Sequence, residues 1–277
     1  MIVAMAFADG AAGKIHYEVH GEHPGTPLVL VMGVAGSCKG WLPFQVPAFS
    51  KRRRVVIFDH RGVAESEDDG KAFSTAELAG DLLAVLDALG AERADVLGAF
   101  MGGMVAQQLA LSAPERLDKL LLAGTYARPD SKRRLLLEQW KEMARADASQ
   151  DLLMRNRLLW TLRDETLDDT ELVNGMIAFF RRDGPAAPTD VFERQCDACL
   201  GHDVLARLAE IERPVLLLCG EHDQLTPPRL HRQMAERLPD ARLVTLPHAG
   251  HLAPAECAER FNLVVEQFLD DERPSEA

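Results

Sequence analysis

The chain has 277 residues, 47% of them hydrophobic and 27% charged. This ordinary globular composition can bury a large core and allows one domain with an insertion or two domains. The formal net charge of −12 comes from 43 acidic and 31 basic residues spread along the chain. That balance argues against a nucleic-acid or anionic-membrane partner and leaves small neutral or cationic molecules as the easier partners.

The five cysteines are scattered and odd in number, which is typical of a reducing compartment. Residues 1–10 lack the basic region and apolar core of a secretory signal, and no later apolar run is long enough to span a bilayer. We therefore expect a cytoplasmic protein. Cys196 and Cys199 form a lone C-x-x-C, for which two buried thiols on a helix are a better interpretation than a metal or redox site.

Apolar runs and helical periodicity alternate along most of the chain. The first run, at 14–20, alternates apolar and polar residues, as in a half-exposed strand, and the later runs are apolar throughout, as in strands buried on both faces. We expect strands at 14–20, 28–32, 54–58, 94–97, 117–123, 214–219 and 242–246, and helices at 75–89, 101–112, 228–238 and 256–269.

One of these helices has clear start and stop signals. Ser74 followed by Glu77 predicts a capping box, and Phe73 with Leu78 predicts the hydrophobic contact outside it. Gly90 is placed to end the helix.

No strand-like run occurs between about residues 126 and 212, where several helical segments follow one another. We interpret residues 126–212 as a helical cap inserted into a core made of residues 1–125 and 213–277. The apolar and aromatic stripes of the cap are expected to form its own core, although the underside of a cap often lines an apolar pocket. The polar tail at 270–277 is expected to fray.

Alternating buried strands and amphipathic helices predict an α/β fold with a mostly parallel, doubly wound sheet, whose ligands collect where the strands end. Small-residue and polar loops follow several predicted strands. They are G-V-A-G-S at 33–37, D-H-R-G-V-A-E-S at 59–66, V-L-G-A-F-M-G-G-M at 96–104, G-E-H-D-Q-L-T-P at 220–227 and H-A-G-H-L-A-P at 248–254.

These segments together resemble the α/β-hydrolase fold of the capped esterase, lactonase and C–C hydrolase type, and the resemblance covers about residues 14–269. It implies that Asp223 orients His251, the general base, and that the backbone N–H groups of Val34 and Met101 form the oxyanion hole. His248 is a rival base, but it does not fit the Gly-His pattern of the family. No cofactor or metal is implied.

The nucleophile position departs from this pattern, because Phe100 stands where the resemblance places serine, between Gly98 and Gly102. A phenyl ring has no proton to give to His251 and no lone pair with which to attack, so acyl-enzyme chemistry at residue 100 is impossible. Ser37 and Cys38 are weaker candidate nucleophiles, and a water activated by His251 is a better one. The elbow residue normally has φ above zero, which strains a bulky side chain.

Three functions follow from this reading. The first is a hydrolase for a small, apolar carboxylic ester or lactone in which Phe100 removes or alters serine-type turnover. The second is an enzyme that uses His251 and Asp223 as a base for a lyase, isomerase or cofactor-independent oxygenase reaction. The third is a binding protein that keeps the pocket without turnover. Substrate identity and oligomeric state are left open by the sequence.

Overall fold

A computed structural model describes residues 2–146, 148–182 and 186–271. Its centre is one eight-stranded sheet in the order β1-β2-β4-β3-β5-β6-β7-β8. The strands are β1 (Ile2–Gly10), β2 (Gly13–His20), β3 (Leu28–Val31), β4 (Val55–Phe58), β5 (Ala94–Ala99), β6 (Leu117–Ala123), β7 (Val215–Gly220) and β8 (Ala241–Leu246). The sheet is parallel from β4 to β8, as the sequence predicts, and antiparallel where β2 joins β1 and β4.

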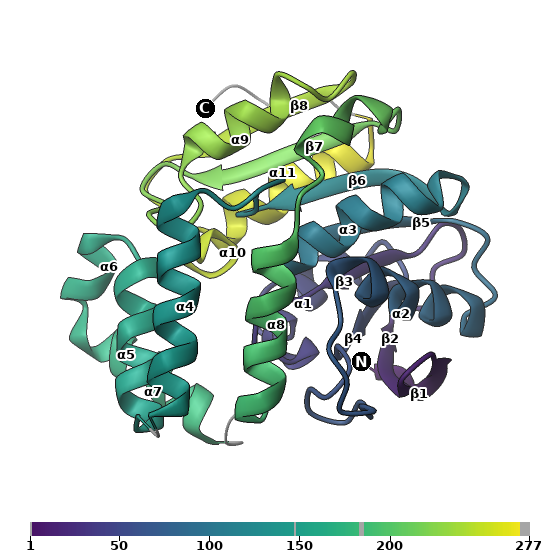
Figure 1. Ribbon diagram of the computed structural model, residues 1–277. Helices are drawn as coiled ribbons and strands as arrows, with labels where there is room; N and C mark the ends of the chain where they lie inside the picture. Colours follow the sequence, from purple (N-terminus) through teal and green to yellow (C-terminus); the bar gives the residue numbers. More distant parts are fainter. Residues whose placement is uncertain (1, 147, 183–185, 272–277) are drawn as a thin grey trace.

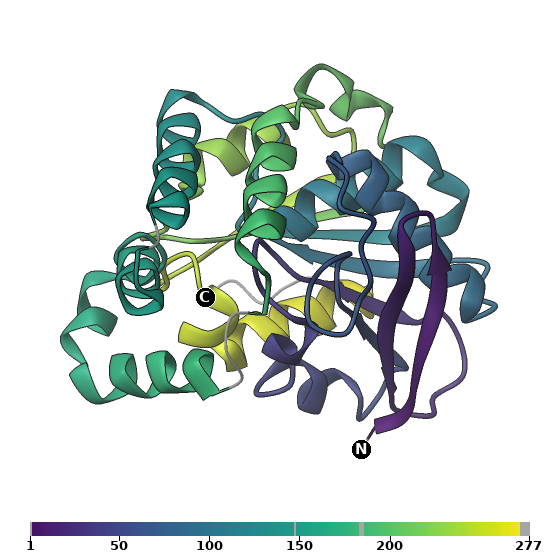
Figure 2. The same ribbon diagram turned by 60° about the horizontal axis from the view of Figure 1, so that its bottom comes forward.

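The hairpin of β1 and β2 was only half predicted, because the sequence pattern indicated the second strand and no strand within the first ten residues. Met5 and Phe7 of β1 are more than half exposed, so the strand lacks the usual alternation of buried apolar and exposed polar residues. Figure 2 shows this hairpin at the opposite side of the molecule from α5–α7. Its first strand, β1, forms one edge of the sheet.

Successive residues of the buried strands point to opposite faces of the sheet and enter two separate cores. Val29 and Val31 of β3 pack with α2 (Thr75–Ala88), α3 (Met101–Ser112) and α9 (Pro228–Ala235), whereas Leu28 and Leu30 pack with α1 (Gln45–Phe49) and α11 (Ala258–Leu269). The layers are visible in Figure 1. Burial on both faces explains why these strands are continuously apolar.

The predicted capping box at the start of α2 is confirmed. The hydroxyl of Ser74 accepts from the Glu77 backbone, and the Glu77 carboxylate accepts from the Ser74 backbone. At the other end of the helix Gly90 has φ of 62°. The last helical segment was predicted as one helix from 256, but it is divided at Cys257 into α10 (Ala253–Glu256) and α11.

The chain between β6 and β7 forms five α-helices and no strand within its described residues: α4 (Ser131–Arg145), α5 (Gln150–Thr161), α6 (Asp164–Asp168), α7 (Thr170–Arg182) and α8 (Thr189–Gly201). Trp140, Leu158 and Ile177 are buried, as expected of a helical core, whereas Leu135 and Leu159 are largely exposed, against that expectation. The side chains of Phe179 and Phe180 and the tail at 272–277 lie outside the described residues. The division into core and cap stays a prediction.

None of the helices in the described ranges has the length and apolar character needed to cross a membrane.

Candidate active site

The elbow between β5 and α3 contains two glycines at which any side chain would force the neighbouring backbone to move. A Cβ on Gly98 would lie 2.3 Å from the Gly102 carbonyl oxygen, and a Cβ on Gly102 would lie 2.1 Å from that of Val31. Phe100 caps α3 with φ of 60° and ψ of −120°, a conformation rarely adopted by a residue with a large side chain. The sequence therefore located the elbow and its backbone strain correctly.

Hydrogen bonds from the end of β6 fix the backbone of Phe100. Its N–H donates to the Ala123 carbonyl at 3.0 Å, and the Thr125 hydroxyl donates to its carbonyl at 2.8 Å. The Thr125 N–H in turn donates to Nε2 of the buried His231 at 3.2 Å, and burial lowers the pKa of His231 to about 4, so that this ring is neutral at pH 7. A buried polar chain thus supports the strained residue.

The phenyl ring of Phe100 lies in a space formed by two glycines and the candidate base. Its centroid is 4.1 Å from that of the His251 ring, with 30° between the planes. A Cβ on Gly33 would lie 2.5 Å from the ring atom Cδ2, and one on Gly124 would lie 3.3 Å from Cδ1 and 3.2 Å from Cε1 of His251. The ring therefore fits because both flanking residues lack side chains.

Asp223 and His251 are brought together from the loops after β7 and β8. Nδ1 of His251 is 2.8 Å from Oδ2 of Asp223, and both side chains are buried. Burial works to raise the pKa of Asp223, but His251 and two hydrogen bonds from Thr226 outweigh it and hold the pKa below its usual range. An ionised carboxylate only accepts, so Nδ1 carries the proton and Nε2 carries the lone pair.

The Nε2 atom of His251 is free to act as a base. It makes no hydrogen bond with the described residues, and it is not sealed from solvent although the residue is only 4% exposed. A water beside this atom could lose a proton to it, which is the chemistry expected of a general base.

The alternative residues are less well placed. His248 is exposed, has φ of 55°, and has no hydrogen bond or ion pair with Asp223 among those of the described residues. Cys38 is fully buried, and burial raises the pKa of its thiol far above the usual range, so it is not a nucleophile at neutral pH. Cys196 and Cys199 are buried, unpaired thiols on α8, in agreement with the structural interpretation of the C-x-x-C pattern.

The loop after β3 carries Val34, whose backbone N–H makes no hydrogen bond within the described residues; the same holds for the N–H of Met101 at the start of α3. Two contacts hold this loop. The Cys38 N–H donates to Oδ1 of Asp59 at 2.7 Å, and the Ala35 N–H donates to Oε1 of Gln195 on α8 at 2.7 Å. Both candidate oxyanion donors are thus unoccupied on supported backbone.

Sequence reasoning missed Thr226 and Gln195. Thr226 follows Asp223 by three residues, a spacing at which an Asp side chain commonly accepts from a nearby backbone N–H, so a local signal existed. Gln195 lies 160 residues from its partner Ala35, and nothing local in the sequence indicates that contact.

One group of side chains has the composition of a metal site. Ligand atoms of His16, Cys38 and Asp59 lie within 4.8 Å of one another, and all three residues are buried. The Asp59 oxygens are already engaged, Oδ2 with Nδ1 of His16 at 2.8 Å and Oδ1 with the Cys38 N–H. This group therefore supports the loop after β3 with its existing hydrogen bonds.

A mostly parallel sheet with this strand order, a glycine elbow after β5 and an Asp–His pair after β7 and β8 define an α/β-hydrolase fold. The family model for the alpha/beta hydrolase fold matches residues 26–256. The chain therefore belongs to the α/β-hydrolase family.

Relatives cover almost the whole chain. A protein of Azorhizobium caulinodans with the provisional name carbamate hydrolase RutD is 32% identical over 272 residues, which are 96% of this chain and 99% of that protein. The enol-lactonase of Burkholderia xenovorans is 28% identical with a TM-score of 0.86, covering 96% and 100% of the two chains. The structure of a provisionally named non-heme bromoperoxidase, BpoC of Mycobacterium tuberculosis, is 30% identical with a TM-score of 0.84, covering 98% and 97%.

Proposed function

We propose that this protein has the active site of a hydrolase for a small carboxylic ester or lactone, and that Phe100, at the nucleophile position, removes or alters serine-type turnover. The observation that carries the proposal is the Asp223–His251 pair, hydrogen-bonded at 2.8 Å and lying directly against the ring at the nucleophile position. A base held by its orienting acid beside the nucleophile position is the arrangement that general-base catalysis requires.

In this proposal the site can bind the carbonyl group of a substrate, but Phe100 cannot accept its acyl group. The carbonyl oxygen of a substrate would face the N–H groups of Val34 and Met101, which have no other partners among the described residues. Since the ring cannot form an ester with the acyl group, any hydrolysis must use water deprotonated by Nε2 of His251. Hydrolases that lack a triad member keep roughly 10³ to 10⁴-fold catalysis over water from the remaining site.

The relatives support an acyl substrate in general terms. The names of two of them, a carbamate hydrolase and an enol-lactonase, denote cleavage at a carbonyl carbon. An ester or lactone is the substrate class that agrees with the lactonase and with the apolar surroundings of Phe100, which packs against one of the two cores.

The test compares the natural chain with Phe100→Ser on p-nitrophenyl acetate and δ-valerolactone. Serine on the elbow would be beside Nε2 of His251, and we expect a rise in hydrolysis of about a thousandfold or more, because removing the serine of a triad elsewhere costs on the order of 10⁶ in kcat. The control, Phe100→Ser with His251→Ala, should lose that gain. If Phe100→Ser is folded and no more active than the natural chain, the proposal is wrong.

A second candidate is a non-hydrolytic enzyme in which His251 removes a proton from a carbon or oxygen acid. The accessible Nε2 atom of His251 favours it, because this base works without any nucleophile at residue 100. Turnover of a carbonyl substrate that is lost in His251→Ala, but is not raised in Phe100→Ser, would identify it. Ligand binding without turnover in any variant would indicate the third function, a binding protein that keeps the pocket.

A further inference from the structure

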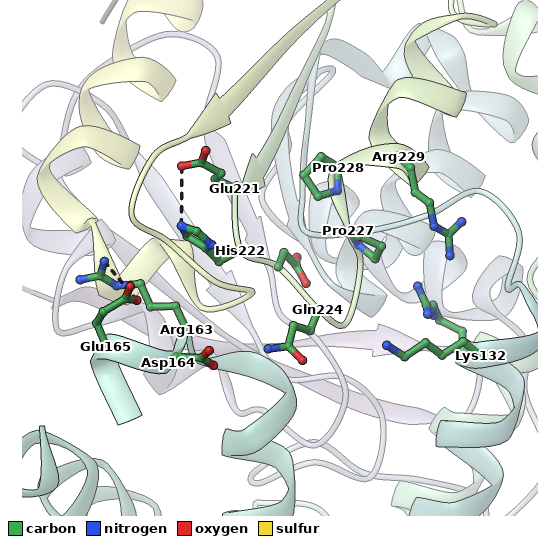
Figure 3. A pocket seen from close by; sticks show the side chains of 12 residues that line it. Lys132, Arg163, Asp164, Glu165, Glu221, His222, Gln224, Pro227, Pro228 and Arg229 are labelled. Atoms are coloured by element: carbon green, nitrogen blue, oxygen red, sulfur yellow. Dashed lines mark ion pairs between the residues drawn. The ribbon is translucent and has the colours of Figure 1, made fainter. Parts of the chain in front are cut away.

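A cavity of about 610 Å³ lies beside the loop that carries Asp223, residues 220–227. It is bounded by the first turn of α4, the start of α9, the loop after β7 and the start of α6 (Figure 3). Asp223 is one of its lining residues, whereas Phe100 and His251 are not. The cavity therefore borders the candidate active site at Asp223 but is not lined by Phe100 or His251, and the proposed ester chemistry does not account for it.

Arg133 on α4 is the unusual residue of this cavity. Its side chain is only 2% exposed, and none of its three guanidinium nitrogens donates a hydrogen bond within the described chain. Nε and Nη1 are sealed from solvent, so the remaining accessible nitrogen is Nη2. Burial lowers the pKa of Arg133, and the nearby Arg229 acts in the same direction. Burying a guanidinium group that makes no hydrogen bonds costs free energy, unless a nearby anion pairs with its charge.

Among the described side chains, the carboxylate in ion-pair range of Arg133 is that of Asp130. Asp130 is shared, since Oδ1 lies 3.0 Å from Nε of Arg133 and Oδ2 is hydrogen-bonded to Arg229. Lys132 has no carboxylate partner among the described residues, and its ammonium lies 4.7 Å from the centre of the Trp160 ring. Arg133 and Arg229 therefore share one carboxylate, and Lys132 adds a third positive charge to this wall.

The opposite wall has the reverse balance. Asp164, Glu165 and Glu221 line it together with Arg163 and His222. Arg163 lies 3.7 Å from Glu165, and Asp164 makes no ion pair with another described side chain. Figure 3 shows Lys132 and Arg229 on one side of the cavity and Arg163, Asp164, Glu165 and Glu221 on the other. The field across the cavity thus has a positive and a negative end.

We infer that this cavity binds a small zwitterion, with its carboxylate against Arg133 and Lys132 and its ammonium group against Asp164. A carboxylate can accept from the accessible nitrogen of a guanidinium and from an ammonium group at once. Dianions such as phosphate fit less well, because the acidic wall repels them. A free amino acid or dipeptide has the required pair of charges.

The experiment is isothermal titration of the full chain with glycylglycine at low salt. N-acetylglycylglycine, which keeps only the carboxylate, and glycylglycinamide, which keeps only the ammonium group, are titrated in parallel. We expect glycylglycine to bind at least about tenfold more tightly than either, since each end loses a charge-assisted hydrogen bond. Equal or tighter binding of N-acetylglycylglycine would overturn the assignment of a zwitterion.

Variants locate the site. Arg133→Met and Lys132→Met should each weaken glycylglycine by about tenfold or more, and Lys132→Met, at an exposed position, keeps the test valid if Arg133→Met fails to fold. Asp164→Asn should weaken glycylglycine and leave N-acetylglycylglycine unchanged or tighter. Lys71→Met, at an exposed lysine outside the cavity, is the matched control. No binding to the natural chain, or binding unaffected by Lys132→Met and Arg133→Met, would refute the inference.

Discussion

Replacing Phe100 with glycine should cost far less stability than a Phe replacement usually does. The half-buried ring contacts Gly33, Gly124 and His251, and losing those contacts should cost about 1 to 2 kcal/mol, since complete burial of a Phe is worth roughly 1.5 to 3 kcal/mol. The greater freedom of glycine in the unfolded chain adds about 1 kcal/mol.

The backbone of residue 100 offsets this loss. A large side chain at φ of 60° and ψ of −120° stores on the order of 1 to 3 kcal/mol, and glycine adopts this conformation without strain. The terms nearly cancel, so we expect Phe100→Gly to change the free energy of unfolding by about 1 kcal/mol or less. Phe58→Ala in the fully buried core should lose about 3 to 5 kcal/mol.

Urea unfolding of Phe100→Gly, Phe100→Ala and Phe58→Ala measures these differences. Alanine at residue 100 loses the ring but keeps a Cβ in the strained conformation, so Phe100→Ala should be less stable than Phe100→Gly. An alanine variant as stable as the glycine variant would show that residue 100 stores no strain, and the cancellation described above would then be wrong.

Three further outcomes follow from the structure. Gly98→Ala should lower the free energy of unfolding by about 3 kcal/mol or more, because its Cβ would lie 2.3 Å from the Gly102 carbonyl oxygen. The control is Gly80→Ala on the exposed face of α2, where a Cβ meets nothing. In urea unfolding it should be neutral or stabilising by up to about 1 kcal/mol. Burial, with Asp118 nearby, raises the pKa of Asp95 to about 7, so the natural chain loses stability as pH rises from about 4 to 7. Asp95→Asn should therefore be more stable than the natural chain by as much as about 4 kcal/mol at pH 8 and by little at pH 4. Equal gains at both pH values would contradict this. Burial lowers the pKa of His231 to about 4, so its contribution is present above about pH 6.5 and is lost by about 3 kcal/mol as pH falls to 4. His231→Gln should therefore flatten the unfolding free energy between pH 6.5 and 4, and His222→Gln, at a half-exposed position, should not.

Most of the fold could be predicted from local sequence patterns. The capping box of Ser74, the elbow around Phe100 and the strand before Asp223 are each defined by residues within a few positions, and the structure has all three where the sequence placed them. The missed strand β1 has the opposite character. It is held by pairing with β2 and exposes Met5 and Phe7, so periodicity could not reveal it.

The candidate site was predictable in its parts and not in its contacts. Spacing located Phe100, Asp223 and His251, because each follows a recognisable strand. The space that accepts the phenyl ring is formed by Gly33 and Gly124, which lie on other strands and meet only in the folded chain. Long-range juxtaposition also produced the contact of Gln195 with Ala35 and the charge separation of the cavity, neither of which has a local signature.

The same contacts explain why one substitution can decide the chemistry. The backbone of Phe100 is held by Ala123 and Thr125, and Asp223 holds His251. None of these hydrogen bonds involves the phenyl ring, so all of them should persist when the ring is removed. The glycines that leave room for the ring leave more room for a serine hydroxyl. A change at residue 100 therefore alters the reacting group while the base, its acid and the elbow stay in place, which makes Phe100→Ser a direct test of the chemistry and not of the fold.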